Sequence, residues 1–157
     1  MDLIEAANAA RRQADVATSV EDQLDSLFGT RKRLAVYGSL APGRQNHHIV
    51  QPLGGTWSDG VIEGDLLTYG WGAAIGFRAL RPRAGGPAVR VHVLASTKLE
   101  RTWAELDAFE GAVYRRVLVP VWSAAAVPEA MLLTVANVYE AALPTDAPPP
   151  SYAERRE

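Results

Sequence analysis

The sequence contains no cysteine among its 157 residues. This absence excludes disulfide bonds, thiolate catalysis and metal sites with cysteine ligands. A strong charge of one sign is also lacking, because 16 basic and 18 acidic side chains leave a formal net charge of −2. Such a balance favours neither a nucleic acid nor an anionic membrane surface as a partner. The composition is otherwise ordinary for one globular domain.

Long apolar runs are missing as well. No segment approaches the roughly 20 apolar residues that a membrane span needs, and the chain does not open with the basic and apolar stretches of a secretory signal. We therefore expect a cytoplasmic protein without a membrane partner. The three histidines, His47, His48 and His92, do not have a ligand spacing such as His-x-x-x-His. We accordingly predict no metal site and no cofactor.

Short apolar runs separated by turn residues predict about six strands. The runs are residues 34–37, residues 55–67 with a turn at Ser58-Asp59-Gly60, residues 88–94, residues 114–122 and residues 131–139. Residues 81–87, rich in proline and glycine, are expected to form a loop. Because few helices connect the strands, the pattern predicts an α+β fold with a small mixed, mostly antiparallel β-barrel and flanking helices.

The two ends of the chain differ in composition from its middle. Residues 1–30 are predicted to form a helical extension, whose second helix starts near Ser19 and ends before Gly29. Residues 31–143 carry the strands and form the main domain. Residues 144–157, with three consecutive prolines and a charged end, are expected to be a disordered tail.

The first strand runs into a loop of small residues. The apolar run ends at Tyr37 and is followed by Gly38-Ser39-Leu40 and then by Pro42-Gly43. Such a loop at a sheet end can turn several backbone N–H groups toward one point and bind an anion. An ordinary turn, in which the serine side chain caps the next segment, is the alternative.

The segment from Thr97 to Arg116 is predicted to contain the principal helix. Thr97 and Glu100 have the spacing of a capping box, and Gly111 is the residue type that most readily follows a helix. Leu99, Trp103 and Leu106 recur at i, i+4 and i+7 and so form one apolar stripe. The next position on this stripe is Glu110, which the pattern therefore directs toward the core.

A carboxylate at Glu110 is subject to two effects that raise its pKa, namely burial and the negative end of the helix dipole. A carboxylate whose pKa is raised toward neutral pH suits a general base that takes up a proton and later returns it. The structural alternative is an ion pair between Glu110 and Arg115 or Arg116, just beyond the turn.

Taken together, these motifs resemble one known family. Val36-Tyr37-Gly38-Ser39-Leu40 with Pro42-Gly43, followed by Leu106-Asp107-Ala108-Phe109-Glu110-Gly111 and Tyr114-Arg115-Arg116, is similar to the γ-glutamylcyclotransferase-like superfamily. The resemblance is best to its small bacterial and plant avirulence-induced-like branch and spans roughly residues 34–140.

The resemblance implies a small mixed β-barrel and an enzyme, an acyltransferase or lyase, that converts a γ-glutamyl amide or peptide to 5-oxoproline and releases the amine. It implies that Tyr37, Gly38, Ser39 and Leu40 bind the substrate, that Glu110 is the catalytic acid–base, and that Tyr114 belongs to the substrate site. Two segments depart from the family pattern and are expected to alter the pocket wall: Val91-His92-Val93 and Phe77-Arg78-Ala79.

The partner that the resemblance implies is thus a small γ-glutamyl molecule. Two other functions remain open from the sequence: a non-catalytic module of the same fold that binds a small metabolite, and an enzyme that removes a γ-glutamyl group in a specialised pathway. Neither the released amine nor the oligomeric state is indicated by the sequence.

Overall fold

The computed structural model describes residues 2–68, 78–124 and 130–142. The helices are α1 (Asp2–Arg12), α2 (Thr18–Phe28) and α3 (Trp103–Glu110). The strands are β1 (Arg33–Val36), β2 (Thr56–Thr68), β3 (Arg78–Pro82), β4 (Ala88–Ala95), β5 (Tyr114–Trp122) and β6 (Leu132–Ala141). Short 3-10 turns occupy Thr30–Lys32, His47–Ile49, Gln51–Leu53 and Thr97–Arg101. The expected disordered tail, residues 144–157, lies outside the described residues. None of the described helices is both long and apolar enough to cross a membrane.

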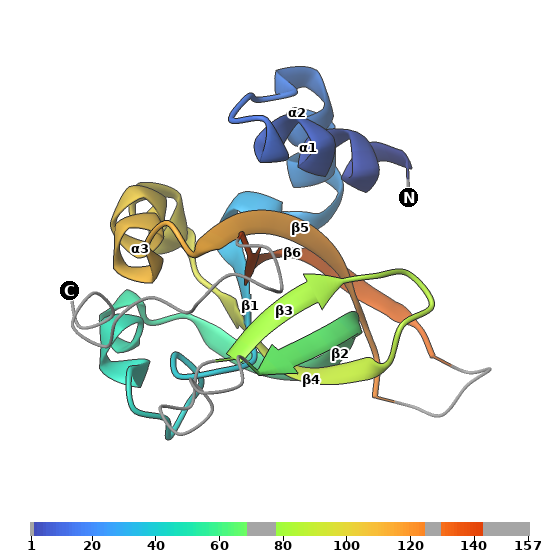
Figure 1. Ribbon diagram of the computed structural model, residues 1–157. Coiled ribbons are helices and arrows are strands. Elements are labelled where there is room, and N and C mark those ends of the chain that lie inside the picture. The colour runs from blue at the N-terminus through green and yellow to red at the C-terminus, as the bar shows by residue number, and fades with distance from the viewer. Residues whose placement is uncertain (1, 69–77, 125–129, 143–157) are drawn as a thin grey trace.

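The strands form one mixed sheet that closes on itself. Their order is β1-β4-β2-β3-β6-β5, and further pairings join β1 to β6 and β2 to β5. The pairs β1–β4, β2–β4, β2–β3, β2–β5 and β5–β6 are antiparallel, whereas β6 runs parallel to β1 and β3. The structure therefore confirms the predicted α+β fold, a small mixed and mostly antiparallel β-barrel with flanking helices (Figure 1).

Alternation along the strands separates the barrel interior from its outer layers. On β6, Ala136 and Val138 face the interior cluster, while Tyr139 packs into the cluster beneath α3. The interior is almost entirely small and β-branched. It contains Ala35, Ile62, Leu80, Val89, Val91, Val93, Val117, Val119, Val121, Ala136 and Val138. A two-residue period of this kind fits strands that have different neighbours on their two faces.

The predicted turn at Ser58-Asp59-Gly60 is wrong, because β2 runs unbroken through it. Gly60 lies where β2 crosses β5, next to the pair Val61–Trp122. A Cβ at Gly60 would come within 2.5 Å of Val121 Cγ1. The glycine thus permits the close approach that closes the barrel, a use that local turn chemistry does not reveal.

The expected loop at residues 81–87 is also partly wrong, since β3 extends through Pro82. Only two of its five residues are apolar, Ala79 and Leu80, and both are buried. The strand is defined by its neighbours, because Leu80 pairs with Leu66 of β2 and with Glu140 of β6. A segment so short and mixed carries little strand signal of its own.

The N-terminal helices dock on the outside of β5 and β6 (Figure 1). As predicted, the second helix ends at Gly29, which has a left-handed φ of 66°; it begins at Thr18, one residue before the expected Ser19. The buried Asn8 of α1 pairs with the backbone of Leu118 on β5 through two hydrogen bonds of 2.8 Å. The helices thereby satisfy backbone groups on the outer side of the barrel.

Candidate functional site

The loop after β1 directs its carbonyl groups inward. The carbonyl of Gly38 accepts from Ala41 N at 3.1 Å, and that of Ser39 accepts from Asn46 N at 2.8 Å. The Asn46 side chain also donates to Ser39 Oγ, at 2.9 Å. Within the part of the chain that the structure describes, the amides of Gly38, Ser39 and Leu40 donate to no carbonyl or side chain. Three successive N–H groups are therefore available to an acceptor outside this loop.

Tyr37 fixes the loop to the end of the barrel. Its hydroxyl donates to the carbonyl of Tyr139 at 2.7 Å and accepts from Leu80 N at 3.2 Å, while its ring packs against the barrel interior. Leu40 is buried and anchors the far end of the motif. Tyr37 thus ties the start of the motif, at the end of β1, to strands β3 and β6.

The helix that bears Glu110 starts later than the sequence predicts. Ser96, not Thr97, caps the segment, and its Oγ accepts from Lys98 N at 3.2 Å. A 3-10 turn follows, so α3 itself begins only at Trp103. The predicted capping box is therefore wrong: Thr97 is the first residue of the turn, and Glu100 is exposed.

The end of α3 agrees with the prediction. Glu110 is its last residue, and Gly111 follows with a φ of 80° and donates its amide to the carbonyl of Asp107 at 3.0 Å. Leu106 is fully buried, whereas Glu110 is half-buried. Glu110 thus shares a helix face with a core residue and remains partly accessible.

The two arginines beyond the turn have other partners than Glu110. Arg115 Nε donates to Glu140 Oε2 at 3.0 Å, and Arg116 forms two hydrogen bonds to Asp107, at 2.9 and 3.2 Å. The structural alternative was an ion pair of Glu110 with Arg115 or Arg116. Within the described residues, this ion pair does not form.

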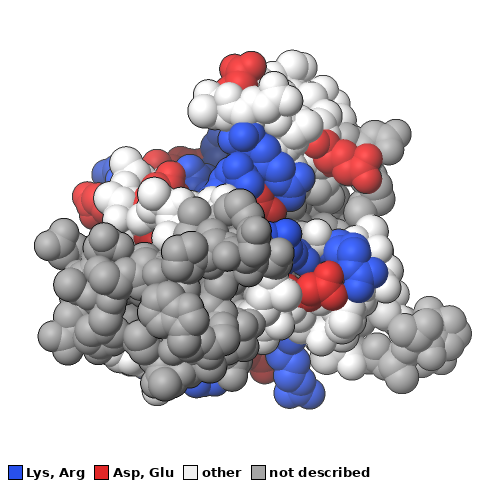
Figure 2. All heavy atoms as spheres, viewed as in Figure 1, with Lys and Arg blue, Asp and Glu red and all other residues white. Residues whose placement is uncertain are grey.

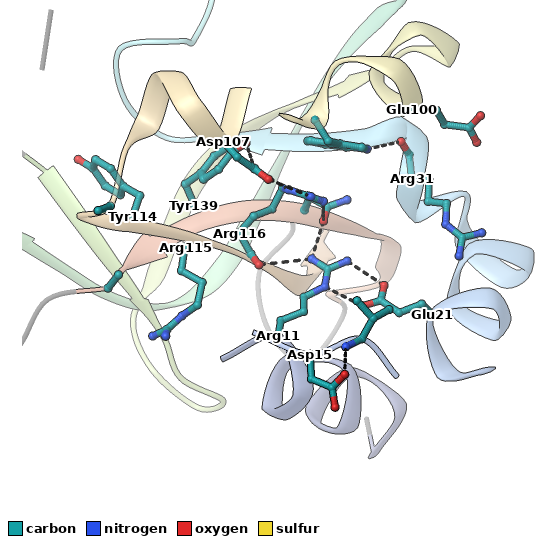
Figure 3. A pocket seen from close by; sticks show the side chains of 15 residues that line it. Arg11, Asp15, Glu21, Arg31, Glu100, Asp107, Tyr114, Arg115, Arg116 and Tyr139 are labelled. Carbon is teal, nitrogen blue, oxygen red and sulfur yellow. Dashed lines mark hydrogen bonds and ion pairs between the residues drawn. The ribbon is translucent and has the colours of Figure 1, made fainter. Parts of the chain in front are cut away.

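Tyr139 connects the loop to α3. Its carbonyl receives the Tyr37 hydroxyl, and its own hydroxyl donates to Asp107 Oδ1 at 2.7 Å (Figure 3). Burial raises the pKa of the Tyr139 hydroxyl, the hydrogen bond and charge of Asp107 add to this effect, and the charge of Glu110 raises it further. The phenol therefore stays protonated and donating at neutral pH, and Glu110 lies within electrostatic range of it.

A pocket of about 940 Å³ opens beside this connection, between the N-terminal helices, α3 and the ends of β5 and β6 (Figure 3). Its polar walls include Arg11, Glu21, Asp107, Arg116 and Asn137. Tyr114 lines it, but Glu110 and the residues of the 37–40 loop do not. Of the predicted site residues, the pocket thus contains Tyr114 alone.

An apolar cluster contains two of the predicted site residues, Leu40 and Tyr114, together with side chains of α3. Leu40 of the loop, Leu106 and Phe109 of α3, Tyr114 of β5 and Tyr139 of β6 belong to the same cluster outside the barrel interior. Glu110 follows Phe109 directly, so the loop and the end of α3 border one region. The sequence pattern alone does not mark Asp107 or Tyr139 as site residues, although Asp107 lies within the helix motif one turn before Glu110.

The departures from the family pattern lie in different places. Val91 and Val93 face the barrel interior, whereas His92 points outward and its Nδ1 lies 2.8 Å from Asp59 Oδ1. Phe77 lies outside the described residues. In the described ranges, no three histidine or acidic side chains gather in a way that suits a metal ion.

The chain is similar to known proteins in sequence and in fold. A family model described as gamma-glutamyl cyclotransferase, AIG2-like matches residues 34–153. Among solved structures, the chain is similar to the crystal structure of an AIG2-like protein from Mus musculus, with a TM-score of 0.52 and 19% sequence identity over 74% of this chain and 80% of that chain. At this identity the likeness concerns the fold. No curated protein sequence matches the chain.

Proposed function

Since this chain belongs to the gamma-glutamyl cyclotransferase, AIG2-like family, we propose that it converts a γ-glutamyl amide or peptide to 5-oxoproline and releases the amine, with Glu110 as the general acid–base. The family membership by itself indicates an enzyme of the cyclotransferase kind. The substrate and the roles of individual residues are our proposal. The observation that carries it is the loop with three available amides, held by Tyr37 and Tyr139 near the end of α3, where Glu110 is the last residue.

The reaction suits a site without a nucleophile of its own. The α-amine of the γ-glutamyl group attacks the γ-carbonyl, a five-membered lactam forms, and the bond from the γ-carbon to the leaving nitrogen breaks. Two protons leave the α-nitrogen and two reach the departing amine, so atoms and charge balance without water. A carboxylate that alternates between its ionised and protonated forms can carry these protons in turn.

The substrate must also be held in a folded shape, so that its amine and its γ-carbonyl meet. The amides of Gly38, Ser39 and Leu40 suit the α-carboxylate, because successive N–H groups form a concave site for an anion. Fixing this end of the substrate converts the attack into a step between aligned groups, which lowers the entropic part of the barrier. The position of Tyr114 in the shared apolar cluster fits a role beside the leaving group.

The test is incubation of the purified protein with a panel of γ-glutamyl dipeptides and γ-glutamylamines, with 5-oxoproline measured by mass spectrometry. The matching α-glutamyl dipeptides serve as controls, because their cyclisation does not release an amine. Free 5-oxoproline from at least one γ-glutamyl compound supports the proposal. Saturable binding without turnover would instead favour a binding module, and release of glutamate would favour a γ-glutamyl-removing hydrolase.

A further inference from the structure

The helix that ends in Glu110 is too short to hold itself in place. It has eight residues, and isolated helices of this length are unstable in water. Its contacts with the rest of the protein include the apolar packing of Leu106 and Phe109 and the hydrogen bond of 2.7 Å from Tyr139 to Asp107. Two of its side chains, Trp103 and Asp107, also contact Arg116. The Arg116 guanidinium lies over the Trp103 ring at 4.4 Å and forms the two hydrogen bonds to Asp107.

Arg116 is held in turn by the N-terminal helices. Its Nη1 donates to Asn137 Oδ1 at 3.2 Å, and Arg11 of α1 donates to the same oxygen at 2.8 Å. Arg11 also reaches the backbone carbonyl of Arg116, at 3.4 Å. Asn137 is 1% exposed, and its amide donates to the carbonyl of Thr30 at 2.7 Å. This junction therefore has little freedom to rearrange.

The guanidinium groups of Arg11 and Arg116 both donate to Asn137, and each forms an ion pair with a different acid. Arg11 forms a bidentate pair with Glu21 of α2, at 2.7 and 2.8 Å, whereas Arg116 pairs with Asp107 (Figure 3). Both members of the first pair are largely buried. Figure 2 shows basic side chains gathered between the N-terminal helices and the rest of the protein. Each arginine thus restricts where the other can lie.

We propose that Arg11 is a positioning residue for catalysis, which acts through Arg116 and Asp107 to fix the last turn of α3 and with it the carboxylate of Glu110. The inference rests on the proposed role of Glu110. It assigns a function to a helix outside the segment that matches the family. The path is continuous: Glu21 holds Arg11, Arg11 and Asn137 hold Arg116, and Arg116 holds Asp107, one turn before Glu110.

The effect is expected in the catalytic step and not in substrate binding. A displacement of about 1 Å at a catalytic group can cost as much as 10²-fold in rate. Arg11 lies on an element that contributes no residue to the 37–40 loop. Its loss should therefore lower kcat while KM stays nearly constant, the pattern of an interaction realised in the transition state.

The first experiment compares Arg11→Gln with Arg12→Gln. Arg12 is the next residue of α1 and also forms two hydrogen bonds to an acid, Glu140, but the pair does not lead to α3. Glu140 keeps Arg115 as a partner when Arg12 is replaced. Both variants are assayed well below their melting temperatures. We expect Arg11→Gln to lower kcat by about 10-fold or more and to keep KM within about twofold of the wild-type value. Arg12→Gln should leave kcat and KM unchanged.

A second variant guards against loss of folding. Arg11→Gln leaves the buried Glu21 without its partner, so Arg11→Gln/Glu21→Gln removes both charges together. This double variant should lower kcat to a similar extent. Arg11→Lys, which keeps the charge, should recover part of the rate. Equal losses of kcat in the Arg11 and Arg12 variants would overturn the inference, as would a normal kcat in a folded Arg11 variant.

A double-mutant cycle tests the route. If Arg11 acts through Asp107, Arg11→Gln should cost nothing further in kcat once Asp107→Asn is present, because the effects of coupled residues are not additive. The kcat of the Arg12→Gln/Asp107→Asn variant should likewise equal that of Asp107→Asn alone. A further loss from Arg11→Gln in the Asp107→Asn background would refute the route. If the wild-type protein forms no 5-oxoproline, the proposed function fails; an active enzyme that is indifferent to Arg11 refutes only the inference.

Discussion

Replacing Glu110 with glutamine separates a catalytic from a structural role. Glutamine keeps the shape of the side chain and most of its hydrogen bonds, but it cannot take up a proton at neutral pH. If Glu110 moves the protons, 5-oxoproline release should fall by ~10²–10⁴-fold, which corresponds to about 2.7–5.4 kcal/mol in the activation free energy. The loss should be in kcat, measured by mass spectrometry under saturating substrate.

The structure predicts a much smaller effect of this substitution on stability. The contacts that Trp103, Leu106 and Asp107 make with the barrel are unchanged by the substitution, and glutamine keeps the length and the hydrogen-bonding positions of the Glu110 side chain. A negative charge at the end of a helix opposes the helix dipole, and its removal is worth roughly 0.3–1 kcal/mol in favour of the folded state. We therefore expect the melting temperature of Glu110→Gln to stay the same or rise slightly.

The control is Glu105→Gln, which removes an exposed carboxylate from the same helix. It should leave both the rate and the melting temperature nearly unchanged. A Glu110→Gln protein that melts much earlier yet releases 5-oxoproline at nearly the wild-type rate would refute the catalytic assignment. Glu110 would then be a structural residue, and the binding-module function would become the better explanation of the fold.

Three further predictions concern the frame around the site. Gly60→Ala should destabilise the protein by about 1–3 kcal/mol through overpacking, since the new Cβ would lie 2.5 Å from Val121 Cγ1. In thermal denaturation, adding Val121→Ala should recover part of this loss. If the losses of stability from the two substitutions simply add, the overpacking explanation is wrong. The pKa of Tyr139 is raised on folding, so its stabilising contribution is complete below the unfolded pKa of about 10 and is lost as pH rises above it, by up to about 1.4 kcal/mol per pH unit. Denaturant titrations from pH 9 to 11.5 should show this slope, and Tyr139→Phe should remove it; a slope that persists in the variant would assign the effect to another group. A crystal grown in sulfate or citrate should place an anion oxygen on the amides of residues 38–40, and an empty loop at high anion concentration would count against carboxylate binding there.

Local signals in the sequence were enough for part of the site. Gly111 marks the end of α3 and therefore places Glu110 at the last position of the helix, because a glycine with positive φ is favoured directly after a helix. The apolar strand followed by small residues predicts the loop at residues 38–40 in the same way. These features depend on neighbours a few residues apart, so their physical cause is contained in the sequence itself. The family resemblance, which the family model confirms, rests on the same two segments.

Other features depend on contacts that no local pattern encodes. The helix starts at Trp103 and not at Thr97, because Ser96 caps the segment and a 3-10 turn intervenes; the Ser96 hydroxyl is fixed by donating to the carbonyl of Leu53 at 2.8 Å, far away in the sequence. Gly60 carries the local signal of a turn, but the crossing of β2 and β5 requires a glycine within a strand. In both cases an interaction formed in the folded chain outweighed a correct local preference.

The sequence by itself determined that Glu110 ends a helix and that a glycine-containing loop follows the first strand, because helix ends and strand ends are set by adjacent residues. Only the tertiary structure decided which acids the arginines bind. Arg115 and Arg116 had Glu110, Asp107 and Glu140 as possible partners, and the register of β5 against β6 brings Arg115 opposite Glu140. The link from Arg11 to Asn137 spans 126 positions of the chain, so it arises only when α1 docks on the barrel.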